Sequence, residues 1–167
     1  MRRVVSYAAS QGHTHFAALV PQTAYGDVAL NAFTSAVADA GGKVVDVQHY
    51  GSASVTGPAQ ATAKAQADAV FIPQGGTLLR TIAPTLALDG LDPNKVKLLG
   101  TGLWDDPALA NEAALEGGWF AGPEPAADDA FAAKYRAEYG APPAQLAPLA
   151  YEAVALVALL ASGTPYH

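Results

Sequence analysis

Short apolar runs alternate with stretches of helical periodicity along the first 120 or so residues, and this alternation constrains the fold most strongly. The runs at 16–20 and 69–72 are continuous, as in strands that are buried on both faces, and residues 96–99 are also expected to form a strand. Residues 44–50 are β-branched and alternating, which also predicts a strand. Strands that are separated by helices predict a parallel sheet with right-handed crossovers. The expected fold class is therefore α/β, a doubly wound, mostly parallel sheet flanked by helices.

Helices are expected before, between and after these strands. Asp27 is the expected N-cap of one helix, and Thr77 is the expected N-cap of a later one. Residues 119–121 are expected to form a short fifth strand, which places Trp119 in the core. The remaining helices are expected at 2–10, 57–67, 128–139 and 146–160. Because no linker-like stretch divides the chain, one domain over residues 1–167 is predicted.

The composition excludes several classes of partner. The chain carries 15 acidic and 9 basic residues, for a net charge of −6, without a basic run. Nucleic acid and anionic membrane surfaces both select for clustered Lys and Arg, so neither is an expected partner. The longest apolar run, 153–161, has nine residues, whereas a bilayer-spanning helix needs roughly 20. We therefore expect a soluble domain without a membrane span.

Motifs for catalysis and for nucleotide binding are missing. The sequence has no GxSxG elbow, no GxGxxG and no GxxxxGK[ST] loop, and it has no cysteine. His13 and His15 lack a third metal ligand placed with them, so a solvated turn is expected there. Asp105 and Asp106 precede Pro107, which is typical of a helix start rather than of a catalytic carboxylate pair. The sequence indicates a binding protein, not an enzyme, with no metal and no cofactor.

A ligand of an open parallel sheet binds outside the carboxyl ends of the strands, and this rule selects the candidate site. The loop that contains Gln74 precedes a helix, so its backbone N–H groups would hold an anion or a carbonyl; alternatively, its glycines only make a tight turn. Tyr25 and Trp104 would stack on a ligand or, alternatively, cap the end of the sheet. The candidate ligand-binding residues are Tyr25, Gln74, Gly75, Gly76, Thr77, Gly102, Leu103 and Trp104.

Segments throughout the chain resemble, in order, one lobe of the type I periplasmic solute-binding proteins of the Leu/Ile/Val-binding family. These segments are 20–26, 40–45, 67–71, 99–102, 104–107, 116–120, and 135–143 with 151–154. Within the family, 101–107 and 117–121 are most similar to the penicillin-binding-protein activators, which are bacterial envelope lipoproteins. The resemblance implies a flavodoxin-like lobe that functions in the periplasm or cell envelope.

The resemblance also implies a site between two lobes, of which this chain would supply the second. We expect an excised lobe, since no first lobe, signal peptide or lipidated cysteine is present in this sequence. Tyr25 matches the family's ligand-contacting aromatic residue. Gly75 stands where the family has another aromatic residue, and Gly102 where it has the acid that holds the ligand's ammonium group.

Without that acid, the ammonium group of a buried amino acid would be uncompensated, at a cost of several kcal/mol. Leu, Ile or Val is therefore disfavoured as the ligand. A different small molecule, amino-acid-like or peptide-like, is one expected partner, and the missing first lobe is another. The alternative is a cell-wall synthase that the domain regulates through protein contacts.

Overall fold

The computed structural model describes residues 1–51, 54–122, 125–144 and 147–162. By its internal contacts the chain divides into two compact units, unit 1 (Met1–Gly122) and unit 2 (Pro123–His167). Unit 1 contains the sheet and its covering helices, and unit 2 contains two helices. One domain over residues 1–167 stays a prediction.

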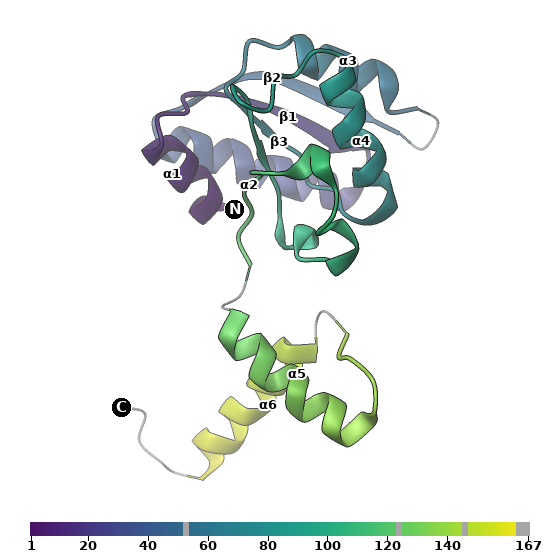
Figure 1. The fold of residues 1–167 in the computed structure, drawn as a ribbon. Coiled ribbons are helices and arrows are strands. Elements are labelled where there is room, and N and C mark those ends of the chain that lie inside the picture. Colours follow the sequence, from purple (N-terminus) through teal and green to yellow (C-terminus); the bar gives the residue numbers. More distant parts are fainter. Residues whose placement is uncertain (52–53, 123–124, 145–146, 163–167) are drawn as a thin grey trace. The chain divides into compact units, whose positions relative to one another are not determined.

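Unit 1 is built on a parallel sheet of four strands in the order β2-β1-β3-β4. The strands are β1 (His15–Pro21), β2 (Lys43–Tyr50), β3 (Ala69–Phe71) and β4 (Lys97–Leu99). The chain leaves β1 on one side to form β2 and returns on the other side to form β3 (Figure 1). The predicted α/β class is thus confirmed. The change of direction at β1 and β3 is the point at which sheets of this kind open a crevice at their carboxyl edge.

Four helices cover the two faces of this sheet (Figure 1). They are α1 (Arg2–Ser10), α2 (Ala24–Asp39), α3 (Thr56–Lys64) and α4 (Gly76–Leu88). Each face of the sheet forms a hydrophobic core with its helices, and alternate residues of β1 pack into one core or the other. Phe16 packs with α1 and α2, and Leu19 packs with α3 and α4. Phe33 stacks on Phe71 at a centroid distance of 4.6 Å and meets Phe16 edge-on at 6.1 Å. β1 is buried from Phe16 to Pro21 and thereby fixes the carboxyl edge between two packed layers.

Both predicted helix caps lie elsewhere in the structure. Thr23, not Asp27, caps α2, because its hydroxyl accepts a hydrogen bond from the Gly26 N–H at 3.1 Å. Gly75, not Thr77, is the N-cap of α4, without a side-chain cap bond. Each helix starts earlier than predicted because the strand-to-helix connections are shorter than the sequence pattern suggested.

The segment after β4 makes three short 3₁₀ turns, η1 (Gly102–Trp104), η2 (Pro107–Leu109) and η3 (Ala113–Leu115). Asp106 begins η2 as a cap, accepting the Ala108 N–H at 2.9 Å, as its position before proline predicts. The predicted fifth strand is reduced to a single parallel bridge between Leu99 and Trp119. Glycines flank this bridge at 117, 118 and 122, where they interrupt an extended strand. Trp119 is half-buried and packs against the core on the α1 and α2 side.

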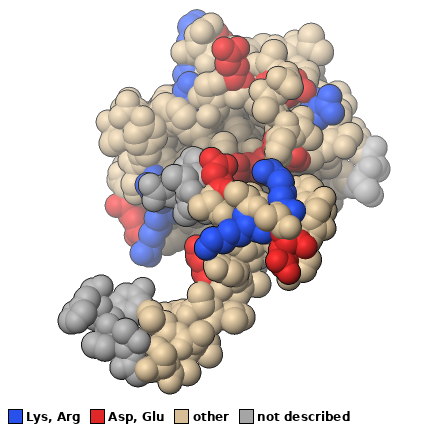
Figure 2. Space-filling model, turned by 60° about the horizontal axis from the view of Figure 1, so that its bottom comes forward, with Lys and Arg blue, Asp and Glu red and all other residues tan. Residues whose placement is uncertain are grey.

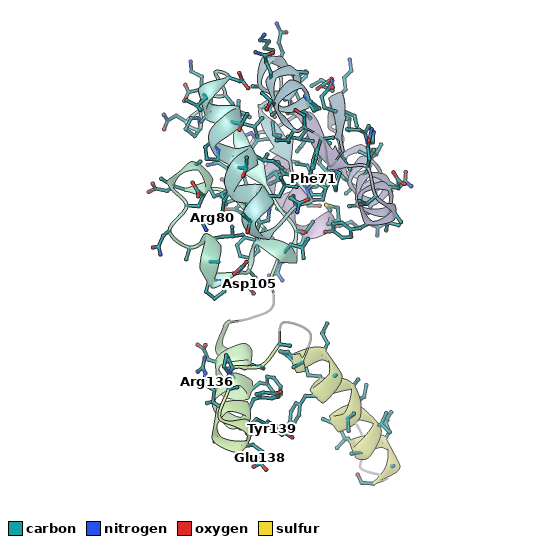
Figure 3. All side chains as sticks on the ribbon, turned by 90° about the vertical axis from the view of Figure 1, so that its right-hand side faces the viewer. Phe71, Arg80, Asp105, Arg136, Glu138 and Tyr139 are labelled. Carbon is teal, nitrogen blue, oxygen red and sulfur yellow. The ribbon has the colours of Figure 1, made fainter. Side chains whose placement is uncertain are left out.

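Unit 2 consists of α5 (Pro125–Tyr139) and α6 (Ala147–Ala161). Phe131 of α5 contacts Tyr151 of α6 at a centroid distance of 5.1 Å, and Tyr139 continues the predicted aromatic stripe of α5 (Figure 3). α5 begins at Pro125 rather than at Asp128, because proline suits the first helical position. The predicted start of α6 at Leu146 lies outside the described residues. None of the helices in the described ranges is long and apolar enough to cross a membrane.

Charged side chains are sparse, and their signs are mixed. On the face shown in Figure 2, Lys and Arg are interspersed with Asp and Glu rather than gathered by sign. Charged residues make up 14% of the sequence. Recognition on this face therefore depends on local groups and their geometry, because no extended field of one sign acts there.

Candidate ligand site at the carboxyl edge of the sheet

A hydrogen bond between Tyr25 and Thr101 spans the carboxyl edge of the sheet. The Tyr25 hydroxyl donates to Thr101 Oγ1 at 3.1 Å. Tyr25 follows β1 and Thr101 follows β4, so the bond passes over the end of β3, which lies between these strands. Thr101 Oγ1 also accepts the Leu103 N–H at 3.3 Å. The Tyr25 side chain remains 46% exposed, so its ring is available to a ligand at this edge.

Gln74 lies at the centre of a second network beside the first. The Tyr50 hydroxyl donates to Gln74 Oε1 at 2.8 Å, and the Trp104 indole N–H donates to the Gln74 carbonyl at 2.9 Å. Gln74 Nε2 donates to the carbonyl of Gly75 at 3.1 Å. The loop after β3 is thereby tied both to the end of β2 and to the loop after β4. A loop that is held by two neighbouring segments is preorganised for binding.

The Trp104 side chain packs in the core directly behind this edge. It is 6% exposed. The ring fills the space that Gly100 leaves, where a Cβ atom would lie 2.2 Å from the ring. Trp104 packs in the core of the α3 and α4 face. Of the two interpretations offered by the sequence, the structure therefore favours capping of the sheet end over stacking on a ligand.

The other candidate residues lie along the same carboxyl edge of the sheet, which is called the rim from here on. Gly75 allows the loops after β3 and β4 to touch, since a Cβ atom there would lie 2.8 Å from the Leu103 carbonyl oxygen. Gly76 has φ +59°, a left-handed conformation that favours glycine. Thr77, Gly102 and Leu103 are exposed. The structure thus brings the predicted residues to one edge but assigns Trp104 and Gly75 to its support.

Tyr50 and Thr101 belong to the site, although the sequence analysis left them out of the candidate set. Both lie at the carboxyl end of a strand, which is the signal that could have found them. Gln22, just after β1, donates its backbone N–H to the Tyr50 carbonyl at 2.9 Å. Its side-chain Oε1 would lie 3.1 Å from a Cβ atom at Gly51. The ends of β1 and β2 are therefore joined at the same rim.

The groups that meet at this rim are hydroxyls and amides. Tyr25, Tyr50, Gln74 and Thr101 supply both donors and acceptors. Three acids lie near these residues in the sequence: Asp27 is exposed in the first turn of α2, Asp106 caps η2, and the Asp105 carboxylate lies beside Gly122. Figure 3 places Asp105 at the border of unit 1, away from the interior position of Phe71. The network itself can therefore hold carboxylate, carbonyl or hydroxyl groups, and it contains no carboxylate that would neutralise an ammonium ion.

The Tyr50 side chain gives a pH signature of the intact rim. Burial raises the pKa of its hydroxyl from 10.0 to about 12. The stabilisation of the folded state by this buried, neutral hydroxyl is fully present below pH 10 and is lost as the pH rises through 12. Between pH 10 and pH 12, the free energy of unfolding in urea should therefore fall by about 2 kcal/mol more for the wild type than for Tyr50→Phe. Equal losses in the two proteins would show that Tyr50 is not buried as described.

A family model described as periplasmic binding protein matches residues 1–165. The chain belongs to this family. The resemblance inferred from the sequence is therefore confirmed at the level of the periplasmic binding protein family. A search of curated protein sequences found no significant match.

Solved periplasmic binding proteins share the fold. A solute-binding protein of an ABC transporter from Rhodopseudomonas palustris BisB5, in complex with 3,4-dihydroxybenzoic acid, is 25% identical with a TM-score of 0.65, over 85% of this chain and 42% of that one. A substrate-binding protein from Desulfitobacterium hafniense in complex with Leu is 26% identical with a TM-score of 0.62, over 93% and 46%. A branched-chain amino acid transporter's ligand-binding protein from Burkholderia xenovorans LB400 is 20% identical with a TM-score of 0.71, over 86% and 40%. The chain therefore spans less than half the length of these proteins.

Proposed function

We propose that unit 1 is a ligand-binding lobe of a periplasmic solute-binding protein that serves an ABC transporter. The network of Tyr25, Thr101, Tyr50 and Gln74 at the carboxyl edge carries this proposal. It lies where ligands of open parallel sheets bind, and it offers positioned donors and acceptors beside an exposed aromatic ring. Its role is binding without catalysis, since the rim presents no nucleophile and base in contact among the described residues.

The chemistry of the rim favours a ligand without an ammonium group. The D. hafniense protein was solved with Leu, and the R. palustris protein with 3,4-dihydroxybenzoic acid. An α-amino acid would bring a cation to a rim of hydroxyl and amide groups and lose several kcal/mol by its burial. A hydroxylated aromatic acid needs only hydrogen-bond partners for its polar groups and an aromatic ring such as Tyr25 to stack on. We therefore favour a hydroxylated aromatic acid over an α-amino acid as the ligand.

A second lobe completes the cleft in this proposal. The chain spans less than half the length of the related structures, which leaves room for another lobe. In unit 2, α6 exposes apolar side chains around its circumference, including Leu149, Val154 and Val157, each about two-thirds exposed. Helices that are apolar all round are buried in complete proteins. The second lobe would supply such a cover.

The apolar surface of α6 also supports a second candidate function. In this alternative, the domain is of the penicillin-binding-protein activator type and regulates a cell-wall synthase through protein contacts. An exposed apolar surface of this extent is typical of a protein-binding site. The two functions differ in their need for a small ligand.

A titration of the chain with 3,4-dihydroxybenzoate and with leucine tests the proposed function. We expect the benzoate to bind and to raise the unfolding temperature, and leucine to bind at least tenfold more weakly. Thr101→Val should weaken binding about three- to tenfold by removing one hydrogen-bonding group. Tyr139→Phe, which removes a hydroxyl from unit 2, should leave binding unchanged. Tighter binding of leucine, or binding that Thr101→Val leaves unaltered, would contradict the proposal.

A further inference from the structure

A separate hollow lies between α1 and the chain segment that follows the Leu99–Trp119 bridge. Its volume is about 380 Å³, within the range of small-molecule sites. All of its lining residues belong to unit 1: Arg3, Val4, Tyr7, Gly118, Trp119, Phe120, Ala121 and Gly122. None of these residues belongs to the network of Tyr25, Thr101, Tyr50 and Gln74 described above.

Aromatic rings form the walls of this hollow. Tyr7 meets Trp119 edge-on, with ring centroids 4.9 Å apart. Trp119 is further held by His13, edge-on at 5.6 Å, and by Lys97, whose Nζ lies 5.0 Å from the ring centroid. Tyr7 and Phe120 are 51% and 41% exposed. The fixed indole and the two exposed rings offer apolar surface that an inserted ring would cover.

Arg3 gives the hollow its charge. Among the described lining residues it is the one ionised side chain, and the structure records no ion pair for it within the described ranges. Its neighbour Arg2 points to a different partner and contacts Asp39 at 3.5 Å. A guanidinium group is suited to bidentate contact with a carboxylate, and it also stacks on aromatic rings.

We propose that this hollow is a second binding site of unit 1, specific for a small aromatic carboxylate. The ligand's ring lies against Tyr7, Trp119 and Phe120, and its carboxylate is held by Arg3. This inference is independent of the ligand site at the carboxyl edge, since it rests on other residues and another cavity.

The two tryptophans of the chain report separately on the two sites. In a ¹H–¹⁵N correlation spectrum, the indole N–H of Trp119 reports on the hollow, and that of Trp104, bonded to Gln74, reports on the carboxyl edge. A Trp119→Phe variant assigns the two signals. We expect phenylacetate to shift the Trp119 signal saturably, and phenethylamine, which carries the opposite charge, to leave it in place.

Arg3→Gln and Arg2→Gln make a matched pair of variants. Both side chains are exposed in the first turn of α1, so either variant should fold normally. Arg3→Gln should weaken phenylacetate binding about three- to tenfold, as expected for loss of a charge-assisted contact, and Arg2→Gln should leave it unchanged. An unshifted Trp119 signal, equal affinity for phenethylamine, or equal effects of the two variants would overturn the proposal. A shift of Trp104 alone would locate binding at the carboxyl edge and leave the hollow unassigned as a site, which also overturns it.

Discussion

Trp104→Ala is expected to lower the free energy of unfolding by about 4 kcal/mol, within the range for truncation of a large buried side chain. The indole is nearly fully buried in the core of the α3 and α4 face. Its loss leaves a cavity beneath Gly100 and removes the donor that holds the Gln74 carbonyl. Chemical denaturation measures the change directly.

Trp104→Phe separates the two parts of this effect. Phenylalanine keeps most of the apolar volume but removes the indole N–H, so a loss of about 1–3 kcal/mol is expected. The phenylalanine variant should also weaken ligand binding at the carboxyl edge, since the loop after β3 loses one of its attachments. If Trp104→Ala cost less than about 1 kcal/mol, the described burial of the indole would be incorrect.

Gly26→Ala is expected to destabilise the protein by about 3 kcal/mol, at the upper end of the usual cost of overpacking. A Cβ atom at Gly26 would lie 2.0 Å from the carbonyl oxygen of Pro21 and 3.0 Å from Val20 Cγ1. The first contact is with backbone, so α2 and the end of β1 must move apart. Because Tyr25 is the neighbouring residue, we also expect its bond with Thr101 to break.

Gly57→Ala is the matched control for Gly26→Ala. Gly57 also lies in the first turn of a helix, α3, but a Cβ atom there meets nothing within 4 Å. Alanine is the better helix former, so the control should stabilise by about 0.5–1 kcal/mol. Opposite signs for the two substitutions would support the described approach of α2 to β1, and equal effects would contradict it.

The sequence was most informative where packing on both faces leaves a regular pattern. Continuous apolar runs identified β1 and β3, since strands buried on both faces need apolar side chains at nearly every position. Helix starts were less predictable, because Thr23 and Asp27 are both good caps and only the length of the connection decides between them. The fifth strand was overestimated because its glycines, and not its apolar residues, determine how far pairing extends.

The candidate site could be located but not assembled from the sequence. Strand ends identified the edge, because the topology of a parallel sheet brings them together. The partners within it come from positions far apart in the chain, such as Tyr50 with Gln74 and Tyr25 with Thr101. Trp104 looked like a loop aromatic, yet a 3₁₀ turn returns its ring beneath Gly100. Such long-range contacts leave no local pattern.

Mapping where a ligand binds is the most direct test of the proposed lobe. A ¹H–¹⁵N titration with 3,4-dihydroxybenzoate records every backbone amide at once and detects even weak binding. We expect the shifts to concentrate at the amides of Tyr25, Gln74, Gly75 and Thr101, together with the Trp104 indole N–H. A titration whose shifts all lie away from the carboxyl edge of the sheet, or that produces none, would contradict it.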